Sequence, residues 1–223
     1  MTLLHLETST KNCSVAISRN GQLLSLCEES ESTTGQAEKV HRFVQWALEG
    51  AEIQLSDLDG VCVSKGPGSF TGLRIGVSAA KGLCFGLNIP LLALNSLEIL
   101  AQTPIDQGFD FIIPMIDARR MEAYTAIFDG KGQALSAIEA KILDESTFQE
   151  FRDKKVVFVG DAVEKSKSVL DLPQAVFSDA WYPSAQQMIA LAEKKFVQKA
   201  WEDVAYFEPF YLKEFRLGVK KQT

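Results

Sequence analysis

The sequence is poor in the residues that build metal and disulfide sites. Its 223 residues include two histidines, His5 and His41, which are too few for most zinc sites. The four cysteines form no CxxC pair, and three of them lie in apolar runs. Buried, reduced thiols in a cytoplasmic protein are therefore expected rather than disulfides.

Long apolar runs and a basic excess are lacking too. No run approaches the roughly 20 residues that span a bilayer, and the start, MTLLHLETST, lacks the basic region and apolar core of a secretory signal. Membrane insertion and export are therefore not expected. Lys and Arg number 23 against 29 Asp and Glu, which gives a net charge of −6. This balance argues weakly against nucleic-acid binding by the chain alone.

The residues that are present have a globular profile, 46% hydrophobic and 23% charged, enough for one large domain or two small ones. In the first half, Asn20-Gly21 predicts a type I′ hairpin between two strands. Apolar residues at helical spacing predict an amphipathic helix over 37–50. The strands expected there are 3–8, 13–19, 22–30, 61–64 and 91–94, and a second helix is expected over 70–86.

TPIDQG, at 103–108, is the clearest boundary in the chain, and a second strand group follows it. The aromatic tail, 206–216, is expected to pack back on the first half. Both halves open with antiparallel strands and continue with helices and short buried strands, so the fold class is α/β with mixed sheets. The elements expected after the boundary are 111–116, 122–128, 133–142, 156–160 and a helix over 184–199.

The stretch KGPGSFTGLRIG, at 65–76, joins a strand to a helix and resembles a phosphate loop. It satisfies neither GxxxxGK[ST] nor GxGxxG, so both standard nucleotide motifs fail. Anion binding by the free N–H groups of the helix start stays open. Gly68, Gly72, Gly76 and Ala80 recur every four residues. This smooth stripe predicts close packing, either within the same chain, for example against the helix over 37–50, or in a helix-bundle interface with another subunit.

Several motifs together resemble the TsaB (YeaZ) family. They are ETSTKNCSVAIS (7–18), SDLDGVCVSKGPGSFTGLRIGVSAAKGL (56–83), IPLLALNSLEILA (89–101), DARRMEAY (117–124), VGD (159–161), PSAQQMIALA (183–192) and EPFYLK (208–213). The resemblance covers nearly the whole chain, and GPGSFTGLRIG is highly specific.

The resemblance implies an actin-like ATPase fold, the fold of actin, Hsp70 and sugar kinases, with two domains of related topology. The expected N-terminal domain is 1–103, joined by the C-terminal segment 203–223, and the expected second, reduced domain is 104–202.

The family is similar to, but shorter than, the catalytic subunit TsaD, which transfers a threonylcarbamoyl group to N6 of the tRNA adenosine after the anticodon. The resemblance implies a non-catalytic subunit that pairs with a TsaD-like chain through two helices, 37–50 and 70–86. A TsaE-like ATPase and tRNA join through the complex, and a homodimer on the same face when the partner is missing stays open as a third option. The partner-binding residues implied are Val40, Phe43, Ala47, Gly68, Phe70, Gly72, Leu73, Gly76 and Ala80.

ATP, Mg²⁺ and a metal ion are expected in the partner subunits, with no cofactor or metal bound by this chain. In TsaD an HxxxH pair on the first helix holds the metal, and Gln36 and Val40 occupy the matching positions here. Valine has no group that ligates a metal. The metal site is therefore expected to be absent.

Two segments match the places where the superfamily holds nucleotide phosphates. One is Glu7-Thr8-Ser9-Thr10, in which the usual Asp is replaced by Glu; a turn that satisfies its own backbone is the alternative. The second is the charge cluster of Asp117, Arg119, Arg120 and Glu122, with Gly160-Asp161 further along. An anion site, a contact with a partner carboxylate and a solvated ion-pair corner stay open there. The alternative function is a stand-alone actin-fold enzyme, either a kinase or ATPase or a glycoprotease-like hydrolase.

Overall fold

The computed structural model describes residues 1–30, 36–178, 180 and 182–213. Its first sheet has five strands in the order β3-β2-β1-β4-β5. β1, β2 and β3 are antiparallel, and β4 and β5 continue the sheet in parallel with β1. The strands are β1 (Thr2–Glu7), β2 (Cys13–Arg19), β3 (Gln22–Glu29), β4 (Gly60–Ser64) and β5 (Leu91–Leu94).

The β2–β3 connection is the hairpin that Asn20-Gly21 predicts. Both residues have positive φ, at 50° and 76°, as a type I′ turn requires. Asn and Gly tolerate this backbone conformation better than other residues do. The local sequence therefore determines how β2 and β3 pair next to their turn, where Arg19 lies opposite Gln22.

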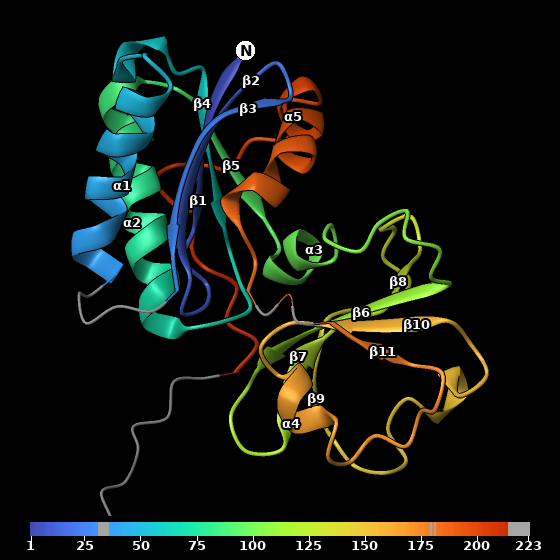
Figure 1. Cartoon of the computed structure of the whole chain (residues 1–223). Helices are drawn as coiled ribbons and strands as arrows, with labels where there is room; N and C mark the ends of the chain where they lie inside the picture. The colour runs from blue at the N-terminus through green and yellow to red at the C-terminus, as the bar shows by residue number, and fades with distance from the viewer. Residues whose placement is uncertain (31–35, 179, 181, 214–223) are drawn as a thin grey trace, which may run out of the picture.

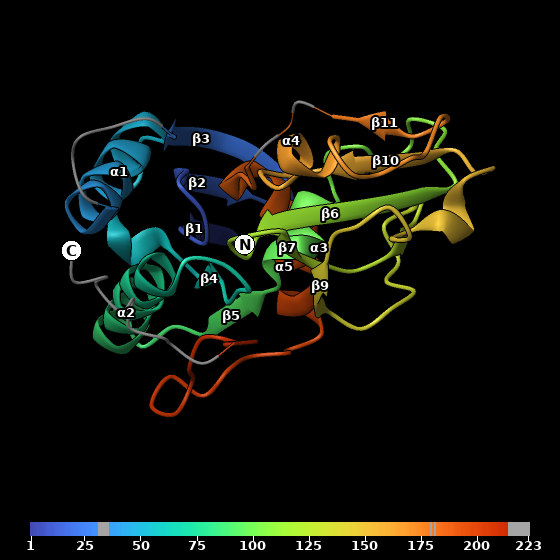
Figure 2. The same cartoon turned by 90° about the horizontal axis from the view of Figure 1, so that it is seen from below.

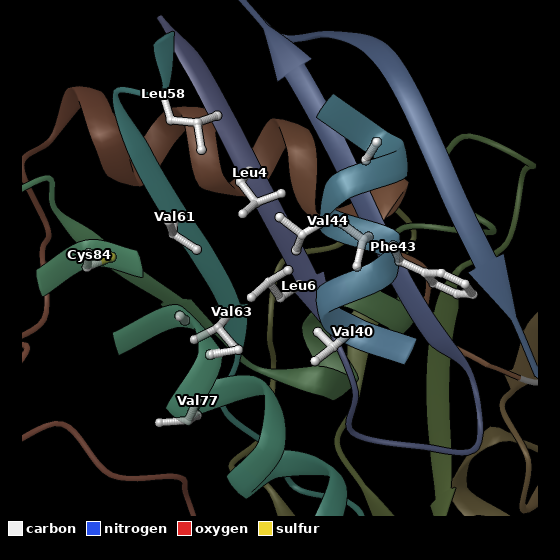
Figure 3. Packing of buried hydrophobic residues seen from close by; sticks show 14 of the residues in the cluster. Leu4, Leu6, Val40, Phe43, Val44, Leu58, Val61, Val63, Val77 and Cys84 are labelled. Carbon is white, nitrogen blue, oxygen red and sulfur yellow. The ribbon is translucent and has the colours of Figure 1, made fainter. Parts of the chain in front are cut away.

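Helices cover both faces of this sheet (Figure 1). α1 (Gln36–Gly50) and α2 (Phe70–Leu87) lie side by side on one face, and α5 (Ile189–Val197) lies on the other. Figure 3 shows Leu4, Leu6, Val61 and Val63 of the strands pointing toward the apolar side chains of α1 and α2. Alternate residues of the same strands face α5, because successive strand side chains point to opposite faces.

The second sheet repeats the topology of the first. Its order is β11-β10-β6-β7-β9, with β6, β7 and β9 antiparallel and β10 and β11 parallel to β6. β6 therefore corresponds to β1, and the β6–β7 turn corresponds to the β1–β2 turn. The strands are β6 (Phe111–Asp117), β7 (Glu122–Thr125), β8 (Phe128–Asp129), β9 (Glu139–Ile142), β10 (Val156–Val159) and β11 (Val176–Phe177).

This duplicated topology confirms the predicted class, two mixed sheets flanked by helices in an actin-like ATPase fold. Three predicted elements differ from expectation. The element expected over 122–128 is divided into β7 and β8. Of the stretch 133–142, residues Glu139–Ile142 form the strand, and the helix expected over 184–199 begins as a 3-10 turn, η3 (Ala185–Met188), before α5. The remaining short helices are η1 (Leu55–Asp57), α3 (Ser96–Leu100), η2 (Gln149–Phe151) and α4 (Val163–Ser166).

Two segments pack on the sheet of the other half of the chain. α3 contributes Leu97 and Leu100 to the apolar cluster against β6 and β10. η3 and α5 contribute Met188 and Ala192 to the cluster under the first sheet. We therefore propose that the second domain extends from about α3 to Tyr182, rather than over 104–202 as the sequence suggested. Among the described residues, no helix combines the length and apolar composition of a membrane span.

The C-terminal tail follows α2 and the edge of the first sheet (Figure 2). The Lys81 Nζ donates to the carbonyls of Ala205 (3.1 Å) and Phe207 (3.0 Å). The Phe210 amide donates to the Lys65 carbonyl at 2.7 Å. From Ala205 to Tyr211 the tail therefore contacts the first half of the chain, whereas Lys213 pairs with Glu122 of the second half. Residues 214–216 of the predicted aromatic tail lie outside the described residues.

Candidate functional site

The three glycines Gly68, Gly72 and Gly76 face the turn between β1 and β2. A Cβ on Gly68 would overlap the Ser9 carbonyl, and a Cβ on Gly72 or Gly76 would overlap the carbonyl or the hydroxyl of Thr8. The Thr8 Oγ1 donates to the Gly72 carbonyl at 2.7 Å, and the Ser69 amide donates to the Ser9 carbonyl at 2.6 Å. The small residues therefore let α2 lie against this turn of the same chain.

The stripe therefore packs within the same chain, as one of its two interpretations had it, although its main neighbour is the turn and α1 contributes only the Gln36 side chain beside Gly72. The other residues implied as partner-binding are also internal: Val40, Phe43, Ala47, Leu73 and Ala80 are at most 6% exposed. Four of them belong to the core between the first sheet and its helices. They face the chain's own strands because they lie on the apolar side of each amphipathic helix. The candidate docking surface is therefore the opposite side of α1 and α2.

On that opposite side, α2 presents a second stripe of small residues, which we call the outer stripe. A Cβ on Gly82 or Gly86 would meet nothing within 4 Å, and Phe85 between them is 84% exposed. Trp46, 47% exposed, adds a second aromatic ring from α1. The exposed residues of the outer stripe are Thr71, Arg74, Ser78, Gly82, Phe85 and Gly86.

Phe70, at the start of α2, is covered by the tail. Its ring lies 4.9 Å from the ring of Tyr211, and the Arg74 guanidinium lies 3.9 Å from its centroid. The Arg74 Nε also donates to the Tyr211 hydroxyl at 3.1 Å. Phe70 therefore joins the tail to α2 rather than standing alone on the docking surface.

The two positions that match the HxxxH metal ligands have other contacts here. The Gln36 Nε2 donates to the Thr10 carbonyl at 2.5 Å, and Val40 is buried in the core. His5 is buried in β1, where its Nε2 is 2.8 Å from the Ser18 Oγ, and burial lowers its pKa to about 3. His41 is on the exposed side of α1. No group of three or more His, Cys, Asp or Glu side chains suited to a metal ion occurs among the described residues.

The first phosphate-loop candidate, Glu7 to Thr10, is buried. Glu7, Thr8 and Ser9 are 0% exposed and Thr10 is 5% exposed. The Ser9 amide donates to the Glu7 Oε1 at 2.6 Å, whereas the Glu7 Oε2 and the Ser9 Oγ have no hydrogen-bond partner among the described residues. Burial raises the pKa of Glu7 to about 7, and the hydrogen bond from Ser9 offsets part of this rise. α2 closes the turn from outside.

The second candidate, Asp117 to Glu122, is exposed and joins β6 to β7. Lys165 of α4 binds the turn through its Nζ. This group forms an ion pair with Asp117 and donates to the carbonyls of Arg120 (2.8 Å) and Glu122 (2.5 Å). Arg119 and Arg120 have positive φ, at 68° and 51°. Sequence reasoning identified this charge cluster but missed Lys165, which lies on a distant segment with no motif of its own.

Gly160 and Asp161 lie beside this turn, because β6 and β10 are parallel and end at the same edge of the sheet. The Asp161 Oδ1 accepts from the Asp117 amide at 2.7 Å. Burial raises the pKa of Asp161 to about 6, and Lys11 of the β1–β2 turn is close enough to lower it in part. The structure thus brings the backbone of Asp117 and Arg119 together with the Asp161 carboxylate.

These features define a class: an actin-like ATPase fold whose first-domain turn is closed by α2. Comparison with known proteins gives the family. The family model described as "TsaD: tRNA N6-adenosine threonylcarbamoyltransferase" matches residues 31–217. The Bacillus subtilis "tRNA threonylcarbamoyladenosine biosynthesis protein TsaB" is 31% identical over 180 residues, covering 77% of this chain and 76% of that protein. The Haemophilus influenzae protein of the same name is 27% identical, covering 96% and 94%.

A solved structure points the same way. The Pseudomonas aeruginosa protein described as similar to the peptidase YEAZ superposes with a TM-score of 0.84 at 27% identity, over 95% of this chain and 99% of that chain. The chain therefore belongs to the TsaD family and, within it, to the TsaB (YeaZ) proteins.

Proposed function

We propose that this chain is a non-catalytic subunit of the complex that forms N6-threonylcarbamoyladenosine in tRNA, next to the anticodon. The names of its TsaB relatives support a role in this synthesis. The catalytic step belongs to a TsaD-like transferase, which this chain activates by pairing with it through a helix bundle. The complex operates in the cytoplasm and includes a TsaE-like ATPase.

One observation carries the pairing surface: the outer stripe of α2. Ser78, Gly82 and Gly86 recur every four residues on the solvent side, and Phe85 is 84% exposed among them. A glycine in the interior of a solvent-exposed helix destabilises the helix by about 1 kcal/mol relative to alanine, so its presence there calls for another role. Small residues beside an exposed aromatic ring allow another helix to approach closely. Without the transferase, we expect a second copy of the chain to occupy the same surface.

The proposed non-catalytic role is supported by the burial of the first turn and by the separation of the two histidines. A kinase or ATPase of this fold needs a phosphate loop that its substrate reaches, and Glu7, Thr8 and Ser9 are fully buried. A hydrolase needs a nucleophile with a partnered base, and the two histidines lie apart, His5 inside the sheet and His41 on the solvent side of α1. Both observations favour a binding role over a stand-alone enzyme.

Co-purification tests the proposal. Gly82→Leu fills the outer stripe without meeting another group, and Phe85→Glu places a charge in its centre. Each variant is expected to lose at least tenfold in affinity for the tagged transferase, while its circular dichroism spectrum stays that of the wild type. Ile142→Glu, at a 65% exposed position of β9, is the matched control and should bind normally. Normal binding by both α2 variants would overturn the assignment of the surface.

A second measurement tests the non-catalytic role. The purified chain with Mg²⁺ and ATP is expected to release no phosphate above background, and to form the modified adenosine only with its transferase present. ATP turnover that disappears in Glu7→Ala would assign an active site to the first turn instead.

A further inference from the structure

The turn between β6 and β7 carries two exposed arginines on a hydrogen-bonded backbone. Four hydrogen bonds fix its backbone: the Arg119 amide donates to the Asp117 Oδ1 (3.0 Å), the Ala118 amide to the Glu122 carbonyl (3.1 Å), and the Lys165 Nζ to the carbonyls of Arg120 and Glu122. All three donors of the Lys165 ammonium are therefore used within the turn and its Asp117 pair. The backbone of the turn therefore needs little further ordering when a ligand binds.

The two arginines of this turn have no carboxylate at ion-pair distance among the described residues, and neither does Lys11. Lys11, Arg119 and Arg120 are all exposed. The neighbouring Lys213 pairs with Glu122 and lies 5.7 Å from the ring of Tyr124. Within the described part of the chain, Arg119 and Arg120 of this turn and Lys11 of the β1–β2 turn are thus cations without an ion-pair partner, although the net charge is −6. Local positive charge against an acidic background attracts anions to this place.

The composition of the turn indicates the kind of anion. Asp117, Arg119 and Arg120 are exposed, and the apolar residues of the turn are Ala118, which is half-buried, and Met121, which is 37% exposed. The centre of a protein–protein interface is apolar and poor in charge, whereas surfaces that bind nucleic acid are polar and positive. Guanidinium groups bind phosphate through paired N–H donors.

We propose that Arg119 and Arg120 bind backbone phosphates of RNA, with Lys11 approaching the same strand from the first domain. This rests on the proposed function in one respect: the RNA is then the tRNA substrate of the complex. The two arginines bind phosphates rather than bases, so they position the tRNA and carry no sequence selectivity.

The test uses fluorescently labelled tRNA and the full chain bound to its transferase, titrated at several salt concentrations. Arg119→Gln with Arg120→Gln is expected to weaken binding roughly tenfold at low salt. The slope of log K against log salt is expected to become shallower by about 0.7 to 0.9 for each phosphate that the variant no longer neutralises. Arg119→Lys with Arg120→Lys should retain the slope, because the charges remain, and should lose part of the affinity, because the paired donors are removed.

Lys154→Gln with Lys155→Gln is the matched control. These two exposed cations precede β10, at the opposite edge of the second sheet from Asp117 and Asp161. Their replacement removes the same charge and should leave the slope unchanged. An equal effect of both double variants would overturn the proposal, since net charge alone would then explain the binding.

Pairing with the transferase is measured in parallel, so that the two proposals fail separately. Loss of pairing in the arginine variant, with tRNA binding by the free chain intact, would assign the turn to a protein partner and overturn the RNA proposal. If the wild type does not pair, the same titration on the free chain still tests the arginines. Wild-type binding and slope in the Gln variant would overturn the proposal in either format.

Discussion

The two hairpin turns that open the two sheets occupy equivalent positions in a duplicated topology, and their surroundings are opposite. In the first sheet, Glu7 to Thr10 are buried and α2 lies across them. In the second sheet, Asp117, Arg119 and Arg120 are exposed, and Lys165 supports them from the protein side. The sheet order alone therefore leaves open whether such a turn meets solvent, because the covering elements decide it.

The difference in burial between the two turns depends on the glycines at the start of α2. Gly68, Gly72 and Gly76 remove the side chains that would keep α2 away from the first turn. The second turn has no equivalent helix among the described residues. α4 has four residues and contributes a lysine, whose flexible side chain reaches the turn from a distance. A helix backbone excludes solvent from the first turn, whereas the second turn is held by hydrogen bonds of its own and by the Lys165 ammonium group, and its arginines stay exposed.

The largest expected effect comes from forcing α2 away from the first turn. The Cβ of Gly72→Ala would overlap the Thr8 carbonyl and the Gln36 side chain, so the backbone must shift. We expect a loss of about 1–3 kcal/mol in the free energy of unfolding. Gly82→Ala, on the same helix in open space, should instead gain up to about 1 kcal/mol from helix propensity. Urea denaturation of both variants measures the contrast, and equal changes would show that α2 does not seal the turn.

The second effect tests the burial of Glu7 through pH. Because burial raises the pKa of Glu7 to about 7 from 4.5, the folded state retains a proton that the unfolded state releases above about pH 4.5. Its contribution to stability is fully present below pH 4.5 and is lost as pH rises through about 7. Glu7→Gln has no charge to bury, so it should match the wild type near pH 4 and be more stable by on the order of 2–3 kcal/mol at pH 8.

Thermal melts at pH 4, 6 and 8 follow this difference. Glu38→Gln, at an exposed position of α1, is the matched control and should give a melting curve that parallels the wild type at each pH. A Glu7→Gln variant that is equally shifted at every pH would show that the carboxyl is hydrated, and the first turn would then be open like the second.

Part of this architecture follows from local sequence. Asn20-Gly21 specifies a hairpin through two positive φ values that few other residues adopt. The order of the strands in both sheets also agrees with the predicted mixed α/β class. The hairpin depends on residues within one turn, so it can be predicted before any long-range packing is known. The strand order cannot, because it joins distant segments, β1 to β4 and β6 to β10.

Which face of α2 packs against the protein could not be predicted from the local sequence. Small residues recur every four positions twice on this helix, at Gly68, Gly72 and Gly76 and again at Ser78, Gly82 and Gly86. The two stripes are offset by two residues, which is about 200° around the helix axis. Periodicity places each on one face but does not tell which face meets the protein. The structure resolves this, because the first stripe faces Thr8 and Ser9 and the second faces solvent.

The smallest expected effect is in the second turn, and it tests whether a single ammonium group is enough to hold it. Lys165→Gln removes the ion pair with Asp117 and leaves the carbonyls of Arg120 and Glu122 to solvent. Both partners of the ion pair are partly exposed, at 22% and 47%, so we expect a loss of about 1 kcal/mol or less. Hydrogen exchange should nevertheless quicken severalfold at the Ala118 and Arg119 amides, whose acceptors lie within the turn.

Lys167→Gln on the same helix is the control for this change. Its ion pair with Glu164 is between side chains 44% and 75% exposed, and its removal should alter neither stability nor exchange in the turn. If Lys165→Gln behaves like Lys167→Gln, the arginine turn is held by its own backbone alone. If exchange quickens only in Lys165→Gln, the Lys165 side chain stabilises the second turn as α2 stabilises the first. Unlike α2, it leaves the arginines of its turn exposed to solvent.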